Sequence, residues 1–203
     1  MMSGFDDKKI KDPVFFKENR IDAHSDHKYY RNNEEFEKDH STFCFSLNGL
    51  WKFNYAEKIG NAPVGFEAAD FNCQGWDDIR VPAHIQLEGY DEPQYVNVQY
   101  PWDGREDISP GEIPTAFNPT ASYVKYFVLP ENFDRKSTYI SFQGVESGMA
   151  LWLNGCYVGY SEDSFTPAEF DLSPYLREGE NKLAVQVYKW TAGSWCEDQD
   201  FFR

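Results

Sequence analysis

Residues 149–160 read MALWLNGCYVGY, and this stretch decides the fold class because it places Asn154 and Gly155 between two apolar runs. An Asn-Gly pair suits the tightest hairpin turn, since both central residues of that turn take a positive φ. The stretch therefore predicts two antiparallel strands joined at residues 154–155.

Strand-like alternation of apolar and polar residues recurs on both sides of this hairpin. It is found in SLNGLWKFNYAE (46–57), SYVKYFVLP (122–130), TYISFQGV (138–145) and NKLAVQVYKW (181–190). The stretch 122–130 has apolar residues in both phases, so we expect a strand buried largely on both faces that stops at Pro130. The alternation predicts these core-facing side chains: Trp51, Phe53, Ile140, Phe142, Leu183 and Val185.

Helical signals are few. The stretch DLSPYLREGEN (171–181) predicts one turn that begins at Ser173, has Pro174 in its first position and ends at Gly179. Many short strands separated by Pro and Gly are typical of a β-sandwich or jelly roll. We therefore predict an all-β domain of two antiparallel sheets over residues 45–203.

Residues 1–44 have a different character, because they are charged and poor in aliphatic side chains. Such a segment cannot form a second core. We predict an extended N-terminal arm that lies over the domain or is partly disordered.

Composition limits the classes of partner. The 203 residues are 41% hydrophobic, which suits a single domain with a sizeable core. The formal net charge of −15 argues against nucleic acid and against an anionic membrane, since both require clustered Lys and Arg. The four cysteines lack CxxC spacing, and the chain has neither an N-terminal apolar run after a basic start nor an apolar run of membrane-spanning length. We predict a cytoplasmic protein without a disulfide framework.

Three stretches have the composition of a functional site, and each also has a structural interpretation. The HSDH of residues 24–27 suggests a metal pair but lacks a third ligand, so solvated histidines are favoured. The acidic CEDQD of residues 196–200 suits a carboxylate site or a solvated loop. The amides, hydroxyls and indole of EPQYVNVQYPWDG (92–104) suit sugar recognition or a well-packed loop.

Four stretches together resemble the N-terminal region of β-galactosidases of glycoside hydrolase family 2, in a match that runs from about residue 12 to the end. These stretches are SLNGLWKF (46–53), VPAHIQLEGYDEPQYVNVQYPW (81–102), NPTASYVKYF (118–127) and the run from FQGVESGMALWLNG to the last residue (142–203). The resemblance implies a jelly-roll sugar-binding domain, followed in the parent enzyme by an immunoglobulin-like domain and a (β/α)8 barrel. Both catalytic glutamates belong to that barrel.

The same resemblance implies that the parent hydrolyses terminal β-D-galactosides such as lactose with retention and forms a homo-oligomer whose subunit contacts involve the arm. The chain is then expected to be a fragment that ends at a domain boundary. It would contain no catalytic residue and would be inactive alone.

The family's galactose contacts fall on three residues of this sequence. Asn97 corresponds to an asparagine that reaches into the galactose subsite, and Val98 contributes to the same wall. Asp200 corresponds to an aspartate that binds a galactose hydroxyl and helps to coordinate sodium, whose other ligands come from the barrel. Magnesium is implied for the parent enzyme. A further divalent-cation site of some members is not expected, because Ala192 replaces a carboxylate ligand, although Glu162 stands at another ligand position.

Two other classes of function stay open at this point. A free-standing carbohydrate-binding module or lectin would keep a whole sugar site on its own surface. A structural or interaction protein that uses the arm and the acidic face would show no sugar specificity.

Overall fold

The computed structural model describes residues 4–25, 27–94, 100–133 and 137–196, and strands dominate these parts of the chain. The strands are β1 (Lys17–Glu18), β2 (Gly49–Ala56), β3 (Asp77–Val81), β4 (Thr120–Val128), β5 (Tyr139–Phe142), β6 (Gly148–Leu153), β7 (Cys156–Glu162), β8 (Ala168–Asp171) and β9 (Glu180–Tyr188). The helical elements are α1 (Asn33–Glu37) and the 3₁₀ turns η1 (Asp7–Lys11), η2 (Ile59–Asn61), η3 (Ile85–Glu88) and η4 (Ala192–Trp195).

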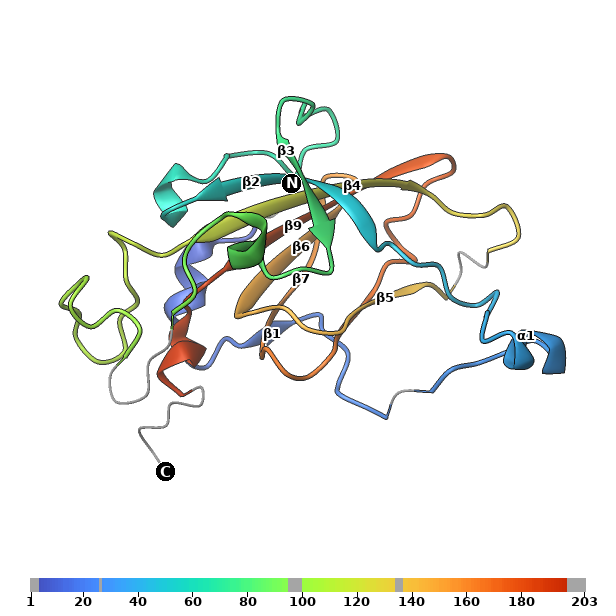
Figure 1. Cartoon of the computed structure of the whole chain (residues 1–203), viewed down its shortest axis with the longest axis horizontal. Coiled ribbons are helices and arrows are strands. Elements are labelled where there is room, and N and C mark those ends of the chain that lie inside the picture. The colour runs from blue at the N-terminus through green and yellow to red at the C-terminus, as the bar shows by residue number, and fades with distance from the viewer. Residues whose placement is uncertain (1–3, 26, 95–99, 134–136, 197–203) are drawn as a thin grey trace.

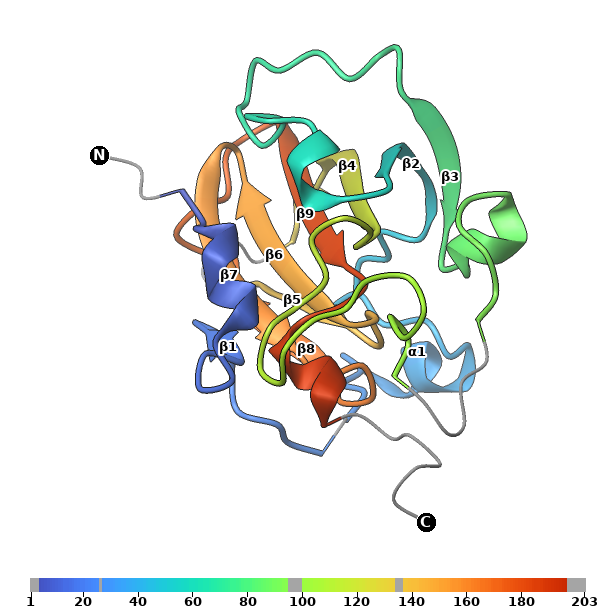
Figure 2. The same cartoon turned by 90° about the vertical axis from the view of Figure 1, so that its left-hand side faces the viewer.

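Two antiparallel sheets form the architecture. The larger has the strand order β1-β7-β6-β9-β4-β2-β3 (Figure 1), and the smaller pairs β5 with β8 (Figure 2). Every pairing within these sheets is antiparallel. The prediction of an all-β sandwich of two antiparallel sheets is confirmed; the finer jelly-roll assignment stays a prediction.

The predicted hairpin joins β6 to β7. Leu153 pairs with Cys156 across a two-residue turn, in which Asn154 has φ 55° and Gly155 has φ 82°. The Asn154 side chain also ties the turn to its surroundings. Its amide nitrogen donates to the Tyr175 carbonyl at 2.9 Å, and its oxygen accepts from the Lys182 N–H at 3.0 Å.

We expect Asn154→Ala to lower the free energy of unfolding by about 2 kcal/mol, because it leaves buried polar groups unpaired and forces a positive φ on alanine. Asn154→Gly removes the same hydrogen bonds but accepts that φ, so it should cost about 1 kcal/mol less. Urea unfolding of the two variants measures the difference. Equal losses would show that the backbone conformation contributes nothing.

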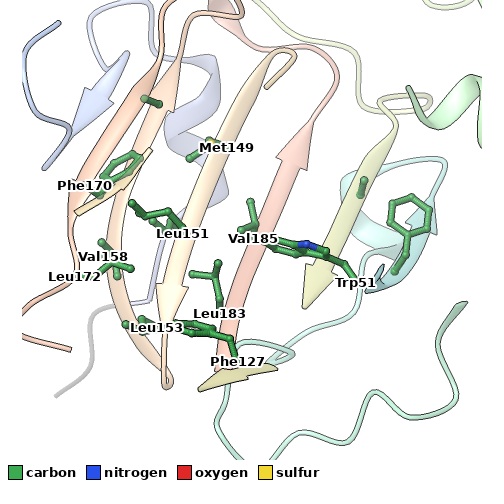
Figure 3. Close-up of a cluster of buried hydrophobic side chains, with 14 of the residues drawn as sticks. Trp51, Phe127, Met149, Leu151, Leu153, Val158, Phe170, Leu172, Leu183 and Val185 are labelled. Atoms are coloured by element: carbon green, nitrogen blue, oxygen red, sulfur yellow. The ribbon is translucent and has the colours of Figure 1, made fainter. Parts of the chain in front are cut away.

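The main core lies between the two sheets (Figure 3). Leu151, Leu183 and Val185 point from the large sheet toward Phe170 of the small one, and all four are at most 3% exposed. The predicted core faces are confirmed, since Trp51, Phe53, Ile140, Leu183 and Val185 are buried and Phe142 is partly buried against this core. Strand periodicity alone was enough to find them.

The opposite face of the large sheet carries a second apolar cluster, so its central strands are buried on both sides. Tyr160 and Tyr188 of this cluster are fully buried, and burial raises the pKa of both phenols. Ile10 of η1 and Phe66 of the β2–β3 connection belong to the same cluster. The cluster therefore depends on segments far apart in the sequence.

Strand β4 corrects one expectation. Val124 is buried in the second cluster, but Tyr126 and Val128 on the same face are 38% and 56% exposed. The prediction that this strand is largely buried on both faces is wrong at this end. In the β2–β3 connection, the Cys73 sulfur lies 3.4 Å from the Tyr126 phenol oxygen. The alternation in the sequence does not indicate how far such a connection covers the strand.

The first part of the N-terminal arm packs into the domain. Ile10 is fully buried, and β1 pairs with β7 at Lys17 and Ser161. The later part of the arm, around α1, is more exposed, with Tyr29 and Phe36 at 69% and 66%. Figure 2 shows η1 and β1 beside β7. The boundary at residue 45 stays a prediction.

The predicted turn after β8 is present as a single hydrogen-bonded turn, in which the Leu172 carbonyl accepts from Tyr175 and Leu176. It does not continue into a helix. No helix within the described part of the chain is long and apolar enough to cross a membrane.

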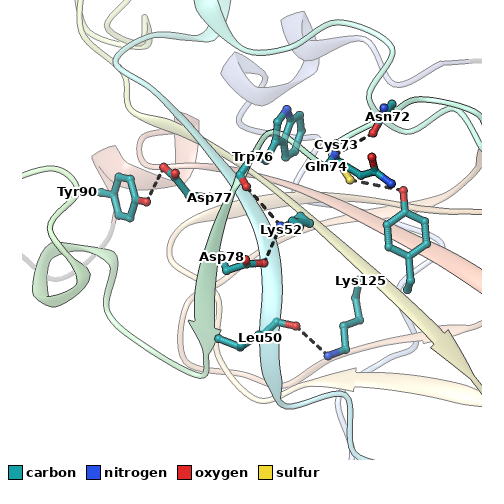
Figure 4. A network of polar contacts seen from close by, with 11 residues as sticks. Leu50, Lys52, Asn72, Cys73, Gln74, Trp76, Asp77, Asp78, Tyr90 and Lys125 are labelled. Carbon is teal, nitrogen blue, oxygen red and sulfur yellow. Dashed lines mark hydrogen bonds and ion pairs between the residues drawn. The ribbon is translucent and has the colours of Figure 1, made fainter.

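Polar side-chain contacts join β2 to β3 at the edge of the large sheet opposite β1 (Figure 4). The Lys52 ammonium lies 3.0 Å from the Asp78 carboxylate and donates to the Trp76 carbonyl at 3.4 Å. The Tyr90 hydroxyl donates to Asp77 at 2.8 Å. The segment that follows β3 and leads toward residue 94 is thereby held against the sheet.

Candidate functional site

Asn97, Val98 and Asp200 lie outside the described residues. The structure does describe the chain next to them, up to Gln94 and from Tyr100 on one side, and up to Cys196 on the other. The described part of the candidate site therefore consists of these flanking segments.

The flanking segments meet in an aromatic cluster. The ring centroid of Trp195 lies 4.5 Å from that of Tyr100 and 4.8 Å from that of Trp102. Tyr100 and Trp102 are stacked at 5.4 Å, and Trp102 also packs edge-on against Trp190 at 6.0 Å. These separations are typical of favourable aromatic pairs. In Figure 2 the loop after residue 100 accordingly runs beside η4.

Hydrogen bonds fix the positions of these rings. The Trp195 indole N–H donates to the Glu112 carbonyl at 2.7 Å. The Tyr100 backbone N–H donates to the Asp103 carboxylate at 3.0 Å, and the Gln94 amide donates to the Pro101 carbonyl at 2.6 Å. Residues on both sides of 95–99 are thus joined directly.

The loop beyond the cluster is organised by Glu106. Its carboxylate accepts from the backbone N–H groups of Thr115 and Ala116, both at 2.8 Å, and from the Thr115 hydroxyl at 3.0 Å. Burial raises the pKa of Glu106, but these hydrogen bonds outweigh it, and the pKa of this carboxyl is lowered from its ordinary value. The carboxylate therefore stays charged and holds the loop closed on itself.

A hollow of about 580 Å³ lies against this cluster. Its lining includes the partly exposed rings of Tyr100 and Trp195 and the exposed polar side chains of Asp103, Arg105 and Asp107. The Arg105 guanidinium also lies 4.5 Å over the Phe117 ring. Flat aromatic faces beside carboxylates can contact both the C–H surface and the hydroxyls of a sugar.

The turn that carries Trp195 is held by a buried carboxylate, Glu162, at the end of β7. Its oxygens accept from the Tyr160 hydroxyl at 2.6 Å, the Thr191 hydroxyl at 2.8 Å and the Gly193 backbone N–H at 3.1 Å. Glu162 as a whole is 6% exposed. A carboxylate buried in this way is stable because its lone pairs are occupied by donors.

This environment does not fit the divalent-cation site considered for Glu162 and Ala192. Such an ion needs several oxygen ligands around it, whereas the groups that face this carboxylate donate hydrogen bonds to it. Ala192 is buried and offers no side-chain ligand. Within the described ranges, no group of three His, Cys, Asp or Glu side chains is arranged to hold a metal.

His24, one of the two histidines considered for a metal pair, lies beside a carboxylate. Its Nε2 lies 2.8 Å from Glu169 on the surface. The structure thus links the arm to β8 at this point.

Sequence reasoning did not find the contact between Trp102 and Trp195. The available signal was the density of aromatic residues in YPW (100–102) and SW (194–195), each beside a proposed ligand segment. Nothing in the spacing showed that the two segments meet, because more than ninety residues separate them.

Comparison with known proteins gives the family. Residues 44–203 match the family described as "Glycosyl hydrolases family 2, sugar binding domain". The chain belongs to glycosyl hydrolase family 2.

Relatives in this family are similar along almost the whole chain. The Beta-galactosidase of Halalkalibacterium halodurans is 56% identical over 195 residues, which cover 96% of this chain and 19% of that protein. The Beta-galactosidase of Streptococcus thermophilus is 48% identical, with coverages of 96% and 19%. For the Beta-galactosidase large subunit of Leuconostoc lactis the values are 45%, 96% and 33%. The chain thus spans between about a fifth and a third of the length of these relatives.

Solved structures of β-glucuronidases share the fold at low sequence identity. A β-glucuronidase from Ruminococcus gnavus in complex with D-glucaro-d-lactam superposes with a TM-score of 0.51 at 19% identity, over 70% of this chain and 21% of that one. A β-glucuronidase of Bacteroides uniformis gives 0.50 at 20% identity, over 71% and 14%. These likenesses support the β-sandwich and nothing finer.

Proposed function

We propose that this chain is the sugar-binding region of a β-galactosidase that hydrolyses terminal, non-reducing β-D-galactose residues, such as that of lactose, with retention of configuration. The observation that carries the proposal is the 56% identity, over 96% of the chain, to a protein named Beta-galactosidase. Asn97, Val98 and Asp200 form part of the galactose subsite. The catalytic glutamates belong to a barrel domain outside this chain, so the chain alone is inactive.

The aromatic cluster supports a shared site for the two ligand segments. Asn97 is three residues from Tyr100, and Asp200 is five residues from Trp195. An extended chain covers at most about 3.6 Å per residue. The Cα atom of Asn97 is therefore within roughly 11 Å of that of Tyr100, and the Cα atom of Asp200 within roughly 18 Å of that of Trp195. The 4.5 Å separation of the Tyr100 and Trp195 rings supports the proposal that both ligand residues belong to one site.

The division of labour follows from the chemistry. A carboxylate and an amide at this rim accept and donate hydrogen bonds to galactose hydroxyls, and a sugar of the wrong configuration leaves them unpaired. Retaining hydrolysis needs two carboxyl groups about 5 Å apart on either side of the scissile bond, which the family places in the barrel. The residues of this chain bind and orient the sugar.

The same proposal extends to ions, assembly and location. Asp200 is one ligand of a sodium ion whose other ligands come from the barrel, so a single carboxylate holds the ion weakly here. Magnesium binds elsewhere in the complete enzyme. The domain is a jelly roll, the complete enzyme is a cytoplasmic homo-oligomer, and the arm takes part in its subunit contacts.

In the complete enzyme, Asp200→Ala should reduce kcat/KM for an aryl β-galactoside more than Asn97→Ala does. A hydrogen bond to a charged group contributes about 1.5–3 kcal/mol and a neutral one about 0.5–1.5 kcal/mol, and Asp200 also loses its sodium contact. Steady-state kinetics of both variants at fixed sodium concentration measure the order. A larger effect of Asn97→Ala would contradict the assigned roles.

A free-standing carbohydrate-binding module is the second candidate, and the hollow beside Tyr100 and Trp195 favours it. Titrating galactose into the isotope-labelled chain separates the two, with glucose as the epimeric control. The enzyme proposal expects galactose binding weaker than millimolar, because most hydroxyl partners are missing and little offsets the cost of association. Saturable micromolar binding, seen at the indole N–H of Trp195, would support the module.

A further inference from the structure

We propose that Glu162 is a positioning residue for the galactose subsite: its buried carboxylate fixes the turn of residues 191–196, which presents Trp195 to Tyr100 and Trp102. The inference rests on the proposed function, because it assigns Asp200 to the sugar. Glu162 itself touches no substrate in this scheme. It acts through the turn of residues 191–196.

The first step is that Glu162 accepts hydrogen bonds from the start of that turn. One oxygen, Oε2, accepts from both the Thr191 hydroxyl and the Gly193 backbone N–H, at 2.8 and 3.1 Å. The other oxygen, Oε1, accepts from Tyr160 at 2.6 Å. Burial, followed by the charge of Glu162 and this hydrogen bond, raises the pKa of the Tyr160 phenol, so the phenol stays a donor.

The second step is the rigidity of the turn itself. Thr191 and Ser194 form a capping box, in which the Ser194 hydroxyl accepts from the Thr191 N–H at 3.1 Å and the Thr191 hydroxyl accepts from the Gly193 N–H at 3.1 Å. Thr191 is fully buried and Ser194 is 3% exposed. A displacement at Glu162 therefore moves the whole turn and not one side chain.

The third step is the lack of free space around the carboxylate. A Cβ atom on Gly193 would lie 2.7 Å from Glu162 Oε2, and one on Gly148 would lie 2.6 Å from Thr191 Cγ2. Both distances are below those of ordinary contacts. Glu162 and Thr191 therefore occupy space that a side chain at residue 193 or 148 would otherwise fill.

The fourth step connects the turn to the site and to the arm. At its far end the turn presents Trp195 to Tyr100 and Trp102, and Cys196 leads into the segment of Asp200. At its near end the Glu162 backbone N–H donates to the Phe16 carbonyl at 2.8 Å, and Arg20 donates to the Glu162 carbonyl at 2.9 Å. Glu162 thus joins the arm to the sugar-binding rim.

Glu162→Gln tests the role of the carboxylate, because an amide keeps the size but turns one acceptor into a donor that faces other donors. In the complete enzyme we expect kcat/KM for an aryl β-galactoside to fall on the order of tenfold, mainly through KM, as one charge-assisted hydrogen bond is lost. In the 203-residue chain, the indole N–H resonance of Trp195 should move. Glu178→Gln, at an exposed glutamate, is the matched control and should change neither.

Thr191→Val provides a second variant if Glu162→Gln does not fold. It preserves the shape of the side chain, removes one donor to Glu162 and should shift KM and the Trp195 resonance in the same direction. A variant that is less stable to heat but keeps the wild-type KM and Trp195 resonance would overturn the positioning role. Failure of the wild-type enzyme to cleave a β-galactoside would instead overturn the proposed function.

Discussion

Gly159→Ala is expected to lower the free energy of unfolding by about 3 kcal/mol, although it adds a single methyl group. A Cβ atom at this position of β7 would lie 2.5 Å from the Glu18 carbonyl oxygen and 2.7 Å from the Phe170 ring. The carbonyl belongs to the backbone of β1 and cannot rotate away, and Phe170 is fully buried in the main core. Relief of the clash therefore requires β1 to separate from β7 or the core to shift.

Chemical denaturation of Gly159→Ala and Gly60→Ala gives the comparison. A Cβ atom on Gly60 has no other atom within 4 Å, so this control should stay within about 0.5 kcal/mol of the wild type. A Gly159→Ala protein as stable as the control would mean that β1 is held to β7 far more loosely than the pairing shows.

Trp102→Ala should have the largest effect, a loss of about 3–5 kcal/mol in the free energy of unfolding. Trp102 is 2% exposed and packs against Tyr100, Trp190 and Trp195, so its removal leaves a cavity among three rings. Because the first and last of those rings flank the proposed ligand segments, sugar binding should suffer as well. Trp102→Phe keeps an aromatic ring and should lose less of both.

Thermal unfolding and the indole resonances of Trp190 and Trp195 measure the two consequences of Trp102→Ala. Phe165→Ala serves as the control, since that side chain is 84% exposed. If the Trp195 resonance stays in place while stability falls, Trp102 supports the core without ordering the rim, and the link between the cluster and the site is wrong.

The fold was predictable from sequence where local chemistry decides it. The β6–β7 turn follows from two residues that accept a positive φ, and the core faces of β2 and β9 follow from the period-2 alternation around Trp51 and Leu183. Each of these signals lies within a few residues of the feature it predicts. The two-sheet class then followed from the number of such segments.

Features that depend on distant contacts were not predictable in the same way. Ile10 is one of few aliphatic residues in a charged segment, yet it is fully buried, because it packs into the cluster on the second face of the large sheet. Tyr126 and Val128 have a strand pattern typical of buried residues, yet the cover does not extend over them. Both depend on where another segment of the chain lies.

In the candidate site, too, some features could be inferred from the sequence and others depend on distant contacts. The residues Asn97, Val98 and Asp200 came from resemblance and lie outside the described residues, so their roles stay predictions. The sequence marked Glu162 only as a carboxylate that some relatives use for a metal. Its three donors, which come from β7 and from the turn of residues 191–196, became visible only in the folded chain.

The outermost strands of the large sheet determine whether a second molecule can add a strand to it. An open strand edge presents unpaired N–H and C=O groups and is a common route to aggregation. At one end, β1 is two residues long, and the Asn19 side chain beyond it donates to the Val158 carbonyl of β7 at 2.8 Å. At the other end, the edge strand carries three exposed charged residues, Asp77, Asp78 and Arg80. The N-terminal arm therefore occupies part of the β7 edge, where a second molecule could otherwise add a strand.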